Sequence, residues 1–337
     1  MVTFPWPDAS ATGVGSMPGT DVREAMRVVL GELPDLPHLP ELPARGPGAD
    51  LVGRGVAALV DLHAEVWPSG WRLAASPGRD ERRARDYLDE DLDVLEEQAF
   101  GLTSPVKVAL VGPWTLAASV ELPHGDKALA DPGACRDLAQ SLAEGLGQHL
   151  HDVHRRLPHA RVLAQLDEPA LPAVLSGTVP TASGFGHLEA VEPEVAEGVL
   201  REVLAAASDA FPVVHCCAAD APIDLLRRAG AAALSLDLAA VLQRRPGAEE
   251  ELGTALEAGV GLFAGVVAPL GPVSEAAATV GPVRELWRRL GLSGEDLARV
   301  VVTPTCGLAG SDPGAVPRLL AAARAGARLL RDQGVDG

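Results

Sequence analysis

The stretch "PVVHCC", Pro212 to Cys217, begins as an apolar β-type run and ends in one imidazole and two thiols. Other apolar runs in the chain also end in a side chain with acid–base or metal-binding chemistry, at Ser16, Asp167, Asp237 and Cys306. In barrels of parallel strands joined by helices, the functional residues lie at the carboxyl ends of the strands. The recurrence of polar strand ends therefore predicts an α/β fold of this kind.

The alternation of β-type and helical segments predicts how many strands the fold contains. Seven strands are expected at 12–17, 106–112, 161–167, 212–217, 232–238, 261–267 and 299–306, and an eighth at 38–43. Helices with apolar residues at three- and four-residue spacing are expected at 21–33, 49–62, 80–100, 134–157, 194–207 and 314–330. Since eight βα units close a barrel, we expect a single (β/α)8 TIM barrel domain over residues 1–337.

Composition argues against several classes of partner. The formal net charge of −18 and the absence of a basic stripe do not suit binding to nucleic acid, which depends on clustered Lys and Arg. The first ten residues lack the pattern of a secretory signal, and Gly and Pro interrupt the longest apolar run, so we expect a cytoplasmic protein without a membrane-spanning part. In a reducing compartment, clustered cysteines are more often metal ligands or reactive thiols than disulfides.

The alternation of side chains along a strand selects among the candidate ligands. His215 and Cys217 share one face of their strand, and Cys216 faces the other way. A closed barrel would bring this pair toward Asp237 and Cys306, which end two other strands. Two thiolates, one imidazole and one oxygen suit tetrahedral Zn²⁺. The alternative, that the cysteines are small buried hydrophobes and His215 is a core histidine, stays open on spacing alone.

Four motifs in this order resemble a known family. The segments "GVGSMP", "LAQLDEPAL", "VVHCC" and "VTPTCGL", between about Thr12 and Cys306, are similar to the catalytic barrel of cobalamin-independent methionine synthase. That family shares a superfamily with uroporphyrinogen decarboxylase and the zinc methylcobalamin:coenzyme M methyltransferases. The resemblance implies a zinc ion held by His215, Cys217 and Cys306, with Asp237 standing where the family usually has Glu.

The resemblance also implies a substrate and a reaction. Val14, Gly15 and Ser16 would cradle the amino-acid end of homocysteine, and Asp167 would be the catalytic residue that binds its amino group. The implied activity is that of a methyltransferase similar to 5-methyltetrahydropteroyltriglutamate–homocysteine S-methyltransferase, which forms methionine. A zinc enzyme acting on another small thiol, and a zinc-binding pseudoenzyme of the same fold, remain alternatives.

Departures from the family leave the methyl donor open. Family members carry two barrels and this sequence matches one, while Ser119, Ala173 and Leu270 stand where the family has a Trp, a Glu and a proton-donating His. The donor is therefore either a methylfolate or a methylcorrinoid, the second carried on a partner protein.

Two neighbouring residues have secondary roles in this interpretation. We expect Glu168 to hold a metal-bound histidine in place. We expect Thr20 or Asp21 to cap the helix that follows, which leaves Ser16 available for a ligand.

Overall fold

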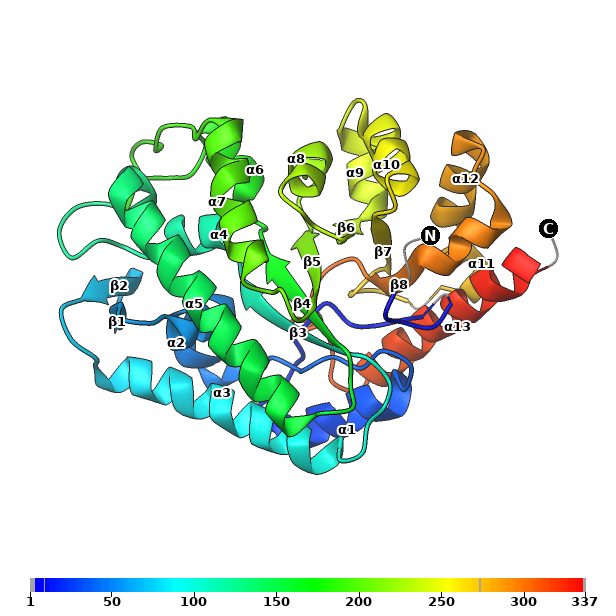
Figure 1. Cartoon of the computed structure of the whole chain (residues 1–337), viewed down its shortest axis with the longest axis horizontal. Helices are drawn as coiled ribbons and strands as arrows, with labels where there is room; N and C mark the ends of the chain where they lie inside the picture. Colours follow the sequence, from blue (N-terminus) through cyan, green and yellow to red (C-terminus); the bar gives the residue numbers. More distant parts are fainter. Residues whose placement is uncertain (1–3, 9, 273, 336–337) are drawn as a thin grey trace.

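The computed structural model describes residues 4–8, 10–272 and 274–335. Its centre is a curled six-stranded parallel sheet in the order β3-β4-β5-β6-β7-β8 (Figure 1). The strands are β3 (Val106–Val111), β4 (Val162–Asp167), β5 (Phe211–Cys216), β6 (Ala233–Asp237), β7 (Gly261–Val267) and β8 (Val300–Pro304). Each lies within two residues of an expected strand, so the apolar runs predicted these six elements correctly.

Two short segments lie between the edge strands β8 and β3, where the sequence predicts two more strands. Isolated backbone bridges join one segment to β8, the other to β3 and the two to each other, through Thr12 N–H to Val302 O (3.1 Å), Leu39 N–H to Lys107 O (2.9 Å) and Met17 N–H to Glu41 O (2.8 Å). The expected strands at 12–17 and 38–43 are thus reduced to isolated bridges. The observed architecture is a TIM-like curled sheet with six regular strands, and eight regular strands are not confirmed.

Helices cover the outer face of the sheet (Figure 1). The α-helices are α1 (Val22–Glu32), α2 (Leu51–Ala58), α3 (Arg79–Gln98), α4 (Pro113–Ala117), α5 (Pro132–Arg156), α6 (Leu171–Ser176), α7 (Pro193–Ala205), α8 (Ile223–Arg228), α9 (Leu238–Arg244), α10 (Ala248–Glu257), α11 (Ala276–Thr279), α12 (Gly281–Leu290) and α13 (Val316–Val335). Short 3₁₀ turns are η1 (Pro43–Arg45), η2 (Pro47–Ala49), η3 (Ala128–Ala130) and η4 (Gly294–Arg299). The six expected helices correspond to α1, α2, α3, α5, α7 and α13.

The first helix begins as its sequence predicts. Asp21 is the N-cap of α1, and its carboxylate accepts the N–H groups of Arg23 (2.9 Å) and Glu24 (3.2 Å). An N-cap acceptor satisfies donors that have no partner within the helix. The side chain of Ser16 is therefore not needed as a cap, as expected.

A β-hairpin after α2 was not expected. The antiparallel strands β1 (His63–Trp67) and β2 (Gly70–Ala74) occupy a stretch that the sequence analysis left without structure. Trp71 of β2 is buried, and its indole N–H donates to the Pro47 carbonyl over 3.3 Å. Trp67 stays 44% exposed beneath the guanidinium of Arg72. The two aromatic residues and the turn between them, rather than a buried apolar run, define this element.

The inward side chains of four strands change from apolar to polar along the strand. Near the amino ends, an apolar cluster joins the strands to the N-terminal segment, with members Trp6, Leu36, Leu163, Val213, Ala233, Phe263 and Val301. Two residues further along four of these strands stand polar residues that are 3% exposed or less, namely Gln165, His215, Ser235 and Thr303. Because every second side chain points to the same face, these polar residues share the interior with the apolar cluster. The interior therefore has a hydrophobic end and a polar end.

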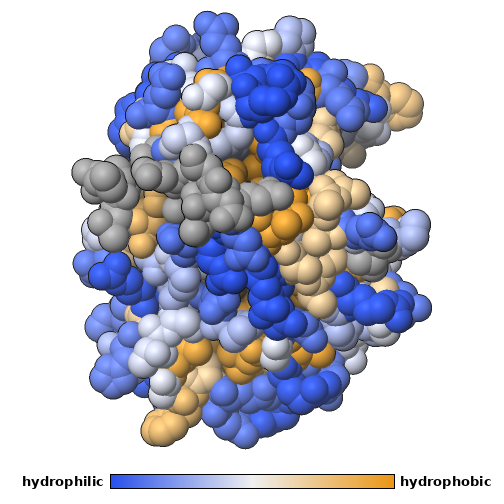
Figure 2. Space-filling view, turned by 90° about the vertical axis from the view of Figure 1, so that its right-hand side faces the viewer, coloured by the Kyte–Doolittle hydropathy of each residue, from blue (hydrophilic) through white to orange (hydrophobic). Residues whose placement is uncertain are grey.

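Hydrophilic side chains cover most of the face shown in Figure 2, with apolar side chains gathered beside its centre. This agrees with the acidic composition of the chain. Within the described residues, no helix combines the length and apolar character that crossing a bilayer requires.

Candidate functional site

His215 and Cys306 come together at the carboxyl ends of the strands. His215 is buried on β5, directly opposite Ser235 on β6, and its Nδ1 lies 2.9 Å from the Ser235 hydroxyl. Cys306 follows β8, and its thiol interacts with the side chains of both His215 and Cys217. Since Nδ1 is occupied by Ser235, Nε2 is the ring nitrogen left for the thiol. The imidazole of His215 and the thiol of Cys217 thus interact with the thiol of Cys306, which comes from a strand distant in sequence.

The two thiols of this group have opposite pKa shifts. Hydrogen bonds from Cys217 and from His215 lower the pKa of Cys306 to about 4. The same contact with Cys306, together with burial, raises the pKa of Cys217. Cys306 is therefore the better thiolate of the pair, with Cys217 as a proton donor to it. Cys216 is fully buried, and burial raises its pKa to about 12.

Asp167 lies at the end of β4, next to His215 in the strand register. Its Oδ1 accepts the Gln165 amide N–H over 2.7 Å, and the carboxyl group is 6% exposed. Burial raises the pKa of Asp167, while His215 and Lys107 oppose that shift. Asp167 thus borders the His–Cys group without a direct cationic partner at hydrogen-bond distance in the described part of the chain.

The segment from Val14 to Ser16 is fixed against the same end of the sheet. The Val14 carbonyl accepts from Lys107 Nζ (2.6 Å) and from Gln165 Nε2 (2.9 Å). The Ser16 carbonyl accepts the backbone N–H of Leu308 over 2.8 Å. Among the described residues, the Ser16 hydroxyl has no hydrogen-bond partner. Ser16 is therefore anchored through its backbone with its side chain unused.

Gly307 packs closely against Ser16. A Cβ atom on Gly307 would lie 2.0 Å from Ser16 Oγ. The glycine after Cys306 thus lets the N-terminal segment approach the metal-ligand candidate closely. The order of the motif, cysteine then glycine, has a steric reason here.

Two charged residues that the sequence analysis missed are buried beside Asp167. Burial lowers the pKa of Lys107 to about 8, and Asp167 and Glu41 partly oppose the shift. Burial raises the pKa of Glu41 to about 7, with Arg54 opposing and Asp167 reinforcing it. Arg54 Nε lies 3.9 Å from Glu41 Oε1 and its Nη1 lies 2.5 Å from Asp91. This network keeps a mixture of buried charges at the polar end of the interior.

The structure corrects the expected role of Glu168. Its carboxylate accepts the N–H groups of Trp114 (2.9 Å) and Thr115 (2.8 Å) and the Thr115 hydroxyl (2.7 Å). Burial raises the pKa of Glu168 to about 7 despite these donors. Glu168 therefore holds the start of α4, and Ser235 rather than Glu168 orients His215. Asp237, expected as the oxygen ligand, is the N-cap of α9, where its Oδ1 accepts the Ala240 N–H over 3.0 Å.

The site residues that were not predicted differ in how clearly the local sequence marks them. Gln165 and Ser235 each precede an expected site residue by two positions, so strand alternation puts them on the same face. Lys107 is a single charge inside the apolar run "VKVALV", which is unusual for a core strand. Glu41 lies in a proline-rich stretch with no periodicity, and nothing local distinguishes it.

The His–Cys contacts are not a preformed coordination shell. No three His, Cys, Asp or Glu side chains in residues 4–8, 10–272 and 274–335 are arranged as a metal ion requires. The side chains of His215 and Cys217 instead interact with the thiol of Cys306. These side chains are of the types that bind Zn²⁺ and lie near one another. They would have to reorient in order to coordinate the ion.

Comparisons with known proteins agree with the fold. No family model and no curated protein matches the sequence. The structure is similar to that of a B12-independent methionine synthase from Shewanella sp. W3-18-1 in complex with selenomethionine, with a TM-score of 0.65 and 12% identity over 98% of this chain and 100% of that one. At this identity the likeness shows a shared TIM-like fold.

Proposed function

We propose that this protein is a zinc methyltransferase that moves a methyl group onto the thiol of homocysteine to give methionine. The observation that carries the proposal is the contact of Cys306 with both Cys217 and His215 at the carboxyl ends of the strands. A methionine synthase of similar fold supports the reaction class. A shared fold does not establish a function, so the proposal depends mainly on the set of candidate zinc ligands.

The proposed ligands are His215, Cys217 and Cys306. Bound Zn²⁺ supplies the positive charge that keeps a substrate thiol deprotonated near neutral pH. Ser235 holds Nδ1 of His215, which directs Nε2 toward the thiols and fixes the ring. Asp237 would have to leave the α9 N-cap to become the fourth ligand, so its ligation is the least supported part of the set.

The amino-acid end of the substrate would lie between Ser16 and Asp167. The unused Ser16 hydroxyl and the neighbouring backbone of Val14 and Gly15 suit a carboxylate. The buried Asp167 carboxylate suits an ammonium group, which would offset its desolvation. The complex of the similar methionine synthase with selenomethionine fits an amino-acid product. We propose methylfolate or a methylcorrinoid on a partner protein as the donor.

One experiment tests the metal and the reaction together. Purified protein is analysed for zinc and then incubated with homocysteine and, separately, methylfolate or methylcobalamin, with methionine as the readout. We expect about one zinc per chain and methionine from one of the two donors. Cys217→Ser and Cys306→Ser should lose zinc and lower the rate by about 10³-fold or more, because the substrate sulphur is no longer activated.

The matched control is Cys216→Ser, whose thiol is buried on the opposite face of the strand. This variant should keep its zinc. Loss of zinc from Cys216→Ser and retention in Cys217→Ser would refute the proposed ligands. Zinc binding without methionine from either donor would favour another thiol substrate or a pseudoenzyme.

A further inference from the structure

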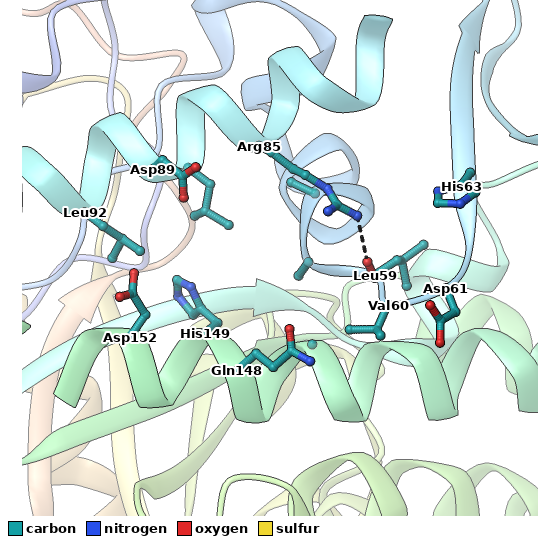
Figure 3. Close-up of a pocket in the computed structure, with 14 residues that line it drawn as sticks. Leu59, Val60, Asp61, His63, Arg85, Asp89, Leu92, Gln148, His149 and Asp152 are labelled. Atoms are coloured by element: carbon teal, nitrogen blue, oxygen red, sulfur yellow. Dashed lines mark hydrogen bonds between the residues drawn. The ribbon is translucent and has the colours of Figure 1, made fainter. Parts of the chain in front are cut away.

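A cavity lies between α3 and α5 and against the end of α2 (Figure 3). Its volume is about 430 Å³. Figure 3 shows Gln148, His149 and Asp152 rising from α5, with Arg85, Asp89 and Leu92 descending from α3. Asp89 and Asp61 stand toward opposite ends of this cavity. We call it the α3–α5 groove.

The floor of the α3–α5 groove is rigid. A Cβ atom on Gly145 would lie 1.7 Å from the Ala58 carbonyl oxygen, so α5 crosses the end of α2 at the closest approach that glycine allows. The Ser141 hydroxyl then bonds to both the N–H (2.9 Å) and the carbonyl (2.7 Å) of Val60. The groove is therefore held open by the fold and does not depend on a mobile loop.

The cations of the groove already have partners. Arg85 lies 2.9 Å from the buried carboxylate of Glu81 and donates to the Leu59 carbonyl over 3.1 Å. His63 Nδ1 lies 3.2 Å from the same Glu81 carboxylate. Glu81 therefore largely neutralises the positive charge of Arg85 and His63 at this end of the groove.

The groove contains more carboxylates than its cationic side chains neutralise. Asp152 is bound by Arg155 and Arg156. Asp61 and Asp89, by contrast, have no ion pair or hydrogen bond to another side chain in the described residues. Partial burial raises the pKa of Asp89, and Asp152 reinforces that shift while Arg156 opposes it. A ligand with positive charge at both ends would complement these two carboxylates.

His149 provides an independent sign of a missing partner. Its side chain lines the groove and is 6% exposed, yet its Nε2 has no hydrogen-bond partner. Burial, reinforced by Arg54, lowers the pKa of His149 to about 4, so the ring is neutral and can accept a hydrogen bond. A buried acceptor without a donor is costly, and a ligand donor or a water that it orders would remove that cost.

We infer that the α3–α5 groove binds a small aliphatic diamine. One ammonium group would be held at the Asp89 and His149 end, and the other at the Asp61 end. The methylene chain would lie along the apolar side chains of Leu88 and Leu92. Ammonium groups are hydrogen-bond donors only, which matches carboxylates and a neutral imidazole.

Calorimetric titration of the full chain with 1,4-diaminobutane tests the inference. We expect one binding site with a Kd of about 1 mM or tighter. Asp89→Asn and Asp61→Asn should each weaken binding by about tenfold, since each removes one charged contact. Both residues are exposed, so these variants should fold. 1,4-Butanediol should not bind, and butylamine should bind about tenfold more weakly.

The matched control is Asp137→Asn, an exposed carboxylate on the same helix α5 that does not line the groove. Binding by this variant should stay within about twofold of wild type. Equal weakening in Asp137→Asn would show general charge attraction and overturn the inference. So would equal binding of butylamine, or no binding of the diamine at about 10 mM.

Discussion

The two ends of the sheet interior differ in the chemistry of their buried side chains. At the amino ends, Trp6 packs edge-on against Phe263 and Phe211, with ring centroids 5.1 Å apart in each pair. At the carboxyl ends, the interior is polar, and several buried atoms have no partner among the described residues, including Thr12 Oγ1, Glu41 Oε1, Gln165 Oε1 and Thr303 Oγ1. Aromatic packing stabilises the first end, where the buried Trp6 Nε1 also has no partner among the described residues.

Along the same strands, the amino ends therefore contribute mainly to stability, and the carboxyl ends carry the candidate functional site. Apolar burial contributes free energy of folding in proportion to the area removed from water. A buried polar atom without a partner costs free energy unless water or a ligand satisfies it. The polar end thus carries a cost that the apolar end offsets, and ligand binding would recover part of it.

The largest expected effect is on stability at the apolar end. Phe263→Ala should lower the free energy of unfolding by roughly 3–5 kcal/mol, because it removes a fully buried ring that contacts Trp6. Urea denaturation followed by tryptophan fluorescence measures this change. Phe100→Ala, at a 91% exposed site, is the control and should change the free energy by less than about 0.5 kcal/mol. A similar small change in both variants would remove the distinction between the two ends.

The second-largest expected effect is the pH dependence of the unfolding free energy that Lys107 causes. Its pKa is about 8 in the folded protein, below its ordinary value, so between pH 8 and about 10.5 the unfolded chain binds more protons. The unfolding free energy of wild type should therefore rise with pH in this window, relative to Lys107→Met, by up to about 1.4 kcal/mol per pH unit. Urea denaturation at several pH values measures the slope.

Lys127→Met is the control for this slope, because Lys127 is the other lysine of the chain. Its pH profile should follow that of wild type. A Lys107→Met profile that also follows wild type would show that the lysine keeps its ordinary pKa.

A smaller effect is expected on substrate binding at the polar end. Asp167→Asn should raise KM for homocysteine by about 10- to 100-fold with a smaller change in kcat, because the amide cannot pair with the substrate ammonium. Initial rates of methionine formation measure both constants. Asp220→Asn, an exposed carboxylate in the loop after β5, should leave KM within about twofold of wild type. An unchanged KM in Asp167→Asn would exclude the proposed amino contact.

The smallest effect is expected from Ser235. Ser235→Ala removes the hydroxyl beside Nδ1 of His215, and zinc affinity should fall by about tenfold. Competition with a chromogenic chelator measures the affinity. In Ser176→Ala, which loses a hydroxyl bonded to the Pro172 carbonyl and to the Thr178 hydroxyl, the affinity should not change. An affinity in Ser235→Ala equal to that of wild type would mean that His215 does not depend on this contact or does not bind zinc.

Sequence patterns predicted the elements whose signal is local. Six strands were found because each is a short apolar run, and Asp21 was recognised as a possible cap from its position before an amphipathic helix. The β1–β2 hairpin was missed because its strands are short and half-exposed, so neither alternation nor an apolar run marks them. His149 has no local signal that separates it from the other histidines of α5, and only the packing of this helix buries its side chain.

The amino-acid sequence by itself determined which residues share a strand face, because side-chain alternation repeats every two residues whatever the strand pairs with. It therefore sufficed to predict that His215 and Cys217 face the same way and that Cys216 faces away, although β5 ends at Cys216. Tertiary structure alone decided that Cys306 reaches both of them, that Ser235 holds His215, and that Glu168 and Asp237 serve helix starts. These choices depend on pairing between strands and helices distant in sequence, and a polar side chain takes whichever buried donor lies within hydrogen-bond distance.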